Sequence, residues 1–80
     1  MTFREIVLRY QNYDPSTGRF DLAREQQEYA RMLGVHQSLV SRVRLGHLPF
    51  SRRIARGLAD AFPAARADLE RAVLPREWVT

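Results

Sequence analysis

Residues 26–46 read QQEYARMLGVHQSLVSRVRLG and hold two short helical patterns separated by Gly34. In each pattern the apolar residues recur at the spacing of one helix face, and the second pattern covers about 37–45, before Gly46. Glycine commonly ends a helix because it adopts the left-handed conformation without a steric penalty. A turn of three to four residues with a glycine between two short helices is typical of a helix-turn-helix, which we place at about 25–46.

The remainder of the chain also carries helix start and stop signals. Besides the helix at about 37–45, the expected helices are roughly Thr2–Gln11 with Thr2 as N-cap, about Leu22–Leu33 with Asp21 as N-cap, one that Ser51 opens and Pro63 closes, and one from Ala65 that Pro75 ends. The predicted fold class is therefore all-α. We expect a compact five-helix bundle around a central helix-turn-helix, in a single domain over 1–80 with a C-terminal tail at 75–80.

The composition argues against several classes of protein. The chain has 80 residues, 45% of them hydrophobic, and no cysteine. A domain of this size has no room for a deep substrate cavity, and without cysteine it has neither disulfides nor Cys-based zinc sites. His36 and His47 lack a clustered third ligand, and no serine lies in a nucleophile-elbow context, so we expect no metal site, no catalysis and no cofactor.

The hydrophobic pattern predicts a location as well. No apolar run approaches the ~18 residues that a membrane span needs. The first ten residues include Arg4, Glu5 and Arg9, where a secretory signal would need an unbroken apolar stretch. We therefore expect a soluble, cytoplasmic protein that does not engage membranes.

All thirteen basic residues are arginine, and they are unevenly distributed. Residues 31–59 hold six arginines and no acid, whereas the rest of the chain holds seven arginines and nine acids. The middle of the chain therefore carries +6 and its flanks together carry −2. Such one-sided positive charge attracts a polyanion such as DNA, with a solvated arginine-rich surface as the alternative.

The central segment closely resembles the helix-turn-helix of the phage Cro/repressor (XRE) family. The matching positions are Gln26, Ala30, Leu33, Gly34, Val35, Gln37, Ser38, Val40, Ser41, Arg42 and Gly46. Pro49 and the pattern Ile54-Ala55-x-x-Leu58 are similar to later parts of the family, so the resemblance covers roughly 25–62. It implies a bundle of the lambda-repressor-like type. It also implies a sequence-specific, double-stranded DNA-binding transcriptional regulator, expected to be a repressor, which is nucleoid-associated when bound to DNA.

The second helix of the motif presents the residues that would read DNA. Apolar residues are expected to hold this helix on the core: Val35, Val40, Val43 and Leu45. An α-helix fits the major groove, where glutamine pairs with adenine, arginine with guanine, and serine with either base or with phosphate. The expected base-reading residues are His36, Gln37, Ser38, Ser41 and Arg42. N-terminal capping is the alternative role for Gln37 and Ser38, and a solvated charge or a phosphate contact is the alternative for Arg42.

The resemblance also implies residues that anchor the DNA backbone. Gln26 corresponds to the family's glutamine that clamps a phosphate at the start of a helix. The loop at 47–50 and the start of the following helix are placed along the sugar–phosphate strand. The expected phosphate-binding residues are Gln26, His47, Arg52, Arg53 and Arg56. The alternatives are an exposed helix-start residue for Gln26 and a salt bridge to Asp60 for Arg56.

One residue of the motif departs from the family pattern. Arg44 stands where an acidic residue usually precedes the closing glycine, and in the family that acid often pairs with an arginine of the first helix. We therefore hypothesise a swapped ion pair between Arg44 and Glu5, the only acid of the first predicted helix.

The segment at 12–20 is rich in turn formers and longer than the family's usual connection. Arg19 in this loop is either an added DNA contact or has no role. We assign the aromatic residues Tyr13, Phe20 and Tyr29 to the core rather than to base stacking, with Phe20 as a hydrophobic staple before a helix.

One recognition helix contacts only a few base pairs, so we expect a homodimer on two half-sites about one helical turn apart. The candidate dimer interface is Leu69, Val73, Leu74 and Trp78. The alternative for Trp78 is packing on the chain's own core. The competing function is a small helical interaction module, an adaptor or antitoxin, whose arginine face binds an acidic protein partner such as a toxin or a co-regulator.

Overall fold

Five α-helices and one 3-10 turn follow one another along residues 1–79. The computed structural model describes residues 1–79, so Thr80, the last residue of the predicted tail, lies outside the described residues. The elements are α1 (Phe3–Tyr10), α2 (Gln26–Leu33), α3 (Gln37–Arg44), α4 (Arg52–Ala61), α5 (Ala65–Ala72) and the 3-10 turn η1 (Pro75–Glu77). The prediction of an all-α domain with five helices is confirmed.

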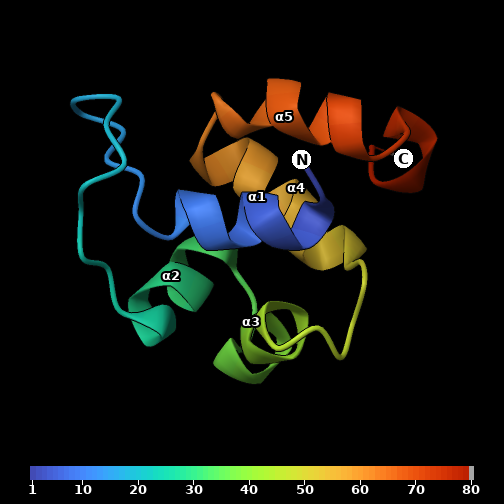
Figure 1. Ribbon diagram of the computed structural model, residues 1–80, viewed down its shortest axis with the longest axis horizontal. Coiled ribbons are helices and arrows are strands. Elements are labelled where there is room, and N and C mark those ends of the chain that lie inside the picture. Colours follow the sequence, from blue (N-terminus) through green and yellow to red (C-terminus); the bar gives the residue numbers. More distant parts are fainter. Residues whose placement is uncertain (80) are drawn as a thin grey trace.

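Helix α1 lies across the middle of the molecule, with α5 on one side of it and α2 and α3 on the other (Figure 1). Helix α4 packs against both α2 and α5, and α1 packs against α3 and α5. The approach of α4 to α2 is very close, because a Cβ atom on Gly57 would lie 2.3 Å from the carbonyl oxygen of Leu33. The outer surfaces of α2 and α3 therefore lie on the side of the molecule away from α5 (Figure 1).

Each helix contributes the apolar stripe that its sequence predicts, and the stripes meet in one core. Its largest fully buried side chains are Tyr29, Phe62, Ile6, Ile54, Leu58, Leu69, Val7, Val40 and Val43. The hydroxyl of Tyr29 donates a hydrogen bond of 2.8 Å to the backbone carbonyl of Val7, so the one polar atom of this ring is satisfied. The assignment of Tyr29 to the core is confirmed.

Three predicted end signals act as expected. Thr2 caps α1 in a capping box with Glu5, and Ser51 caps α4 by accepting a hydrogen bond from the amide of Ile54. Gly34 ends α2 in the left-handed conformation, at φ 71°. These local signals set the starts of α1 and α4 and the end of α2.

The start of the second helix was predicted wrongly. Helix α2 begins at Gln26 rather than Leu22, and Asp21 is not its N-cap. The buried guanidinium of Arg24 donates to the carbonyls of Tyr10 and Gln11, at 3.3 and 3.1 Å, at the end of α1. These two bonds tie the segment before α2 to the C-terminal end of α1, where the last carbonyls of a helix have no partner within it.

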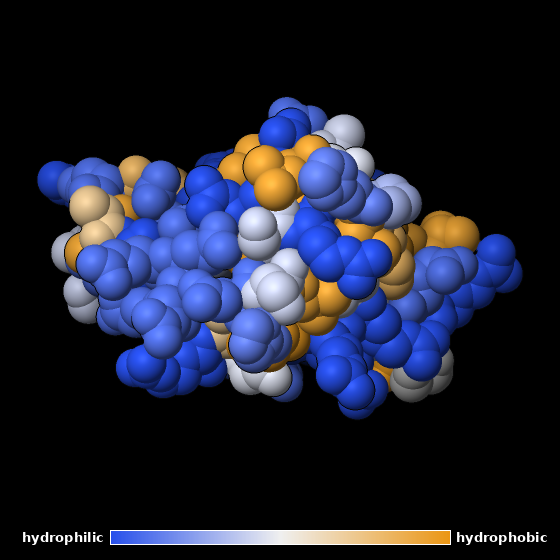
Figure 2. All heavy atoms as spheres, turned by 90° about the horizontal axis from the view of Figure 1, so that it is seen from below, coloured by the Kyte–Doolittle hydropathy of each residue, from blue (hydrophilic) through white to orange (hydrophobic). Residues whose placement is uncertain are grey.

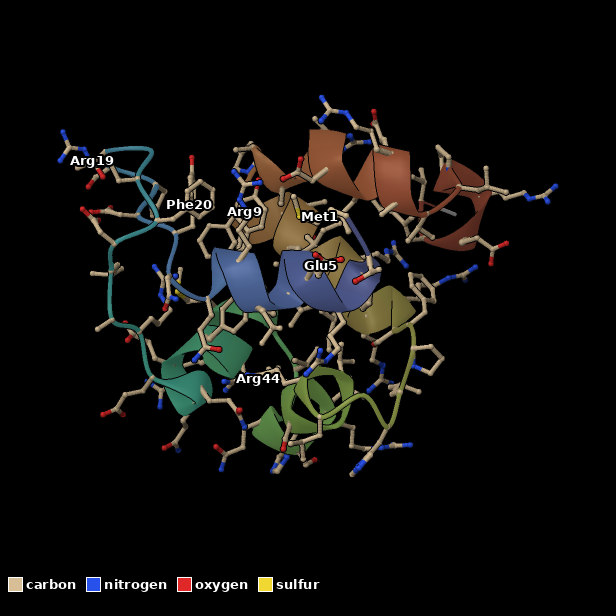
Figure 3. The ribbon with its side chains drawn as sticks, in the orientation of Figure 1. Met1, Glu5, Arg9, Arg19, Phe20 and Arg44 are labelled. Atoms are coloured by element: carbon tan, nitrogen blue, oxygen red, sulfur yellow. The ribbon has the colours of Figure 1, made fainter. Side chains whose placement is uncertain are left out.

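The loop at 12–20 is held to the body of the molecule by aromatic contacts. Tyr13 is half-buried against the core, but Phe20 is 38% exposed, so its assignment to the core was wrong. The Phe20 ring packs against the rings of Tyr10 and Tyr13, at 5.5 and 4.9 Å between centroids, below the guanidinium of Arg9. Arg19 lies at the end of the molecule away from α3 (Figure 3).

The C-terminal residues fold back onto the chain itself. Trp78 is 2% exposed and Leu69 is fully buried, so both belong to the core and cannot form the predicted dimer interface. Val73 is half-buried and Leu74 is 57% exposed, and they remain at the surface. Within residues 1–79, no helix combines the length and the apolar character that crossing a lipid bilayer requires.

Candidate nucleic-acid interface

Helix α3 separates its apolar and polar residues onto opposite sides. Val40 and Val43 are fully buried against the core. The predicted base-reading residues lie on the other side: His36, Gln37, Ser38 and Arg42 are exposed, and Ser41 is half-buried. Figure 2 shows this end of the molecule, where hydrophilic side chains cover most of the surface and apolar side chains form a band between them.

Leu45 was predicted to hold α3 on the core, and this is wrong, since Leu45 is 64% exposed. It follows the last residue of α3 and lies two residues after the buried Val43. Two residues correspond to about 200° around a helix, so its side chain points away from the core. Leu45 adds an apolar residue to the surface near α3.

The N-terminus of α3 is capped by His36. The Nδ1 atom of its ring accepts a hydrogen bond of 3.1 Å from the amide of Ser38 and lies 2.8 Å from the Ser38 hydroxyl. Capping was the alternative role for Gln37 and Ser38, but the capping side chain belongs to His36. Because Nδ1 accepts, a neutral His36 ring carries its proton on Nε2, which is left as a hydrogen-bond donor.

Arg44 connects three helices, and the hypothesised pair with Glu5 is wrong. Its guanidinium donates a hydrogen bond of 2.6 Å to the side-chain oxygen of Gln26, and its backbone carbonyl accepts one of 2.7 Å from Arg4. Glu5 instead accepts from the amide of Thr2, a bond that holds the pKa of its carboxyl below the ordinary value. In Figure 3 Arg44 lies on the side of α1 that faces α2 and α3.

The five residues predicted to bind phosphates are not brought together. Gln26 is half-buried and donates to the carbonyl of Gln37 at 3.4 Å. The guanidinium of Arg52 donates to the carbonyl of Glu77 in η1. Arg56 lines a separate hollow beside Trp78.

His47 and Arg53 are exposed, and neither side chain hydrogen-bonds to another of residues 1–79. Asp60 and Arg56 do not form the alternative salt bridge, since neither belongs to any of the four ion pairs found among residues 1–79. The polar atoms of His47 and Arg53, like those of Arg31 and Arg42, are therefore available at the surface.

None of the arginines in residues 31–59 forms an ion pair with a carboxylate of residues 1–79. The four ion pairs among residues 1–79 use Arg9, Arg66, Arg71 and Arg76, all outside that segment. Arg31, Arg42, Arg53 and Arg56 are exposed, and no carboxylate of residues 1–79 lies within 4.0 Å of them. Their charge therefore acts on the surroundings of the protein.

Sequence reasoning missed two exposed residues of α2, Gln27 and Arg31, which lie beside the N-terminus of α3. Their spacing of four residues places them on one face of α2, next to Ala30. Arg31 also belongs to the acid-free segment, and it lies three residues before the turn at Gly34. These two signals together could have identified it.

Comparison of the chain with protein-family models, with curated proteins and with solved structures finds no match in any of the three.

Proposed function

We propose that this protein is a sequence-specific, double-stranded DNA-binding transcriptional regulator of the helix-turn-helix type, with a lambda-repressor-like fold. In this proposal α3 enters the major groove, and its exposed polar edge contacts the bases. Gln37, Ser38 and Arg42 supply the hydrogen-bonding groups that pair with base edges. A homodimer would place two such helices on neighbouring turns of DNA and so occlude a promoter.

The observation that carries the proposal is the division of α3 into a buried and a polar side. The two valines of α3 are fully buried against the core, while Gln37, Ser38 and Arg42 are exposed to solvent. The arginines of residues 31–59, which form no ion pair with a carboxylate of residues 1–79, add a long-range attraction for the phosphates of DNA. The resemblance of residues 25–62 to the Cro/repressor family supports the same function.

The test is selection of bound duplexes from a random DNA pool at near-physiological salt, with the number of chains per duplex measured on the selected sequence. We expect a palindrome with half-sites about ten base pairs apart. Arg42→Ala should weaken binding to that site by ~1–3 kcal/mol and relax the preference at one base pair. Recovery of no shared sequence, with binding lost at moderate salt, would refute the proposal.

The second candidate is a protein-interaction module, and the exposure of Leu45 favours it. This side chain is 64% exposed beside the arginines of α3, and an apolar residue among positive charges suits an acidic protein partner. The two functions differ in their response to salt. Binding to DNA falls steeply as salt rises, with a slope of about 0.9 per neutralised phosphate, and it discriminates between duplex sequences.

A further inference from the structure

A shallow hollow separates α2 from the N-terminus of α3. Its volume is about 250 Å³. It is lined by Gln27, Ala30, Arg31, Val35, His36 and Gln37. Ala30 is buried and Val35 half-buried, whereas the four polar residues are exposed. The hollow therefore has a small apolar floor and a polar rim that residues from both helices supply.

The polar rim offers hydrogen-bond donors and no carboxylate. Arg31 carries a permanent positive charge and has no ion-pair partner within 4.0 Å among residues 1–79. The Nδ1 atom of His36 accepts from the amide of Ser38, so the ring's donor is Nε2. The side-chain amides of Gln27 and Gln37 add further N–H groups. Donors around one positive charge are the chemistry that binds an oxyanion.

We propose that this hollow binds one phosphate group of the DNA backbone and that Arg31 is the residue that anchors it. The inference rests on the proposed function. When the second helix of such a motif lies in the major groove, the first helix crosses the sugar–phosphate backbone. The hollow lies between the two helices, beside the edge that reads bases, and so faces the strand that borders the groove.

A phosphate in the hollow would fix the angle at which α3 enters the groove. Arg31 comes from α2, while His36 and Gln37 come from the start of α3, so one bound group would contact both helices. Contacts of this kind position the protein and do not discriminate between bases. Arg31 therefore differs in role from Arg42, whose loss changes the sequence preference.

The experiment measures binding of wild-type protein, Arg31→Ala and Arg71→Ala to the duplex obtained by selection. Arg71 is the matched control, because its side chain is 80% exposed and it lies on α5, on the other side of α1 from α3 (Figure 1). We expect Arg31→Ala to bind about tenfold more weakly, by a similar factor on every point variant of the duplex. The slope of log K against log salt should fall by about one, and Arg71→Ala should leave that slope unchanged.

A second arm locates the phosphate. Duplexes are made with a neutral methylphosphonate at one backbone position at a time, and each is bound to wild-type protein and to Arg31→Ala. A methylphosphonate at one position in each half-site should weaken binding of the wild-type protein about tenfold. The same methylphosphonate should have little effect on binding of Arg31→Ala, because both changes remove the same contact. Circular dichroism of Arg31→Ala and Arg71→Ala shows whether the fold is kept. Arg31→Gln is a second variant at the same exposed position that also removes the positive charge.

The outcomes separate this inference from the proposed function. If wild-type protein selects a duplex but Arg31→Ala has the same methylphosphonate profile and salt slope, the phosphate site is wrong and the DNA-binding function stands. If wild-type protein selects no duplex, both are wrong.

Discussion

Gly57→Ala provides the sharpest test of how α2 and α4 are packed. Residue 57 lies within α4, where alanine is the more favourable residue by about 1 kcal/mol because glycine loses more backbone entropy. Helix propensity alone therefore predicts a stabilised protein. The structure predicts the opposite, because the new Cβ atom would lie 2.3 Å from the carbonyl oxygen of Leu33 and 3.0 Å from its Cα atom.

The size of the effect follows from that distance. Cβ atoms essentially never approach another heavy atom within 3.0 Å, so α2 and α4 must separate by several tenths of an ångström. The obstructing atom belongs to the backbone and cannot rotate away. Overpacking of this kind costs about 1–3 kcal/mol, and we place Gly57→Ala in the upper part of that range, for a net loss of about 1–2 kcal/mol after the gain in helix propensity.

The assay is urea unfolding followed by circular dichroism, with the slope of the transition checked for constancy. A loss of 1–2 kcal/mol corresponds to a melting temperature lower by roughly 4–16 °C in a domain of this size. Ala67→Gly is the matched control, since residue 67 is exposed in α5 and reports helix propensity alone, with an expected loss of about 1 kcal/mol. A Gly57→Ala variant as stable as wild type would refute the close packing of α2 on α4.

Three further predictions concern single hydrogen-bonded groups. His36→Ala should lower the free energy of unfolding by about 1 kcal/mol, whereas His36→Asn, which can still cap α3, should retain it, as urea unfolding of both variants would show. Burial and the hydrogen bond to Asp68 raise the pKa of Tyr10 to about 12. The contribution of Tyr10 to the free energy of unfolding is therefore complete below pH 10 and is lost as the pH rises from 10 to 12. In a pH series of unfolding curves, Tyr10→Phe should show a smaller loss of stability over this range. In double-mutant cycles, Arg44 and Gln26 should couple by at least about 0.5 kcal/mol and Arg44 and Glu5 by none, and coupling to Glu5 would contradict the assigned contacts.

Features set by local signals could be predicted from the sequence. Thr2, Gly34 and Ser51 each act on backbone groups within four residues, and all three helix ends lie where these residues predict. The buried valines of α3 and its exposed polar edge follow from the helical period. The exposure of the candidate site was therefore predictable, because one helix determines it.

Features set by contacts between distant segments could not be predicted in this way. Arg24 binds carbonyls thirteen and fourteen residues earlier in the chain, and nothing in its own neighbourhood predicts that α2 starts after it. Arg44 has an acid available in the first helix but bonds to Gln26, because the α1–α3 packing brings the carbonyl of Arg44, and not its guanidinium, to that helix. Apolar composition could not decide whether Trp78 is covered by its own chain or by a partner.

The contacts of Gln26 explain how α3 keeps its orientation. The side-chain amide of Gln26 donates to the carbonyl of Gln37, at the start of α3, and accepts from Arg44, at its end. The first residue of α2 is thereby joined to both ends of α3, and Arg4 joins the end of α3 to α1. A helix held at both ends loses little conformational freedom when a partner binds, so less of the binding energy is spent on ordering it. Gln26 therefore fixes the position of α3, and in the proposed function this role does not require its side chain to reach a phosphate.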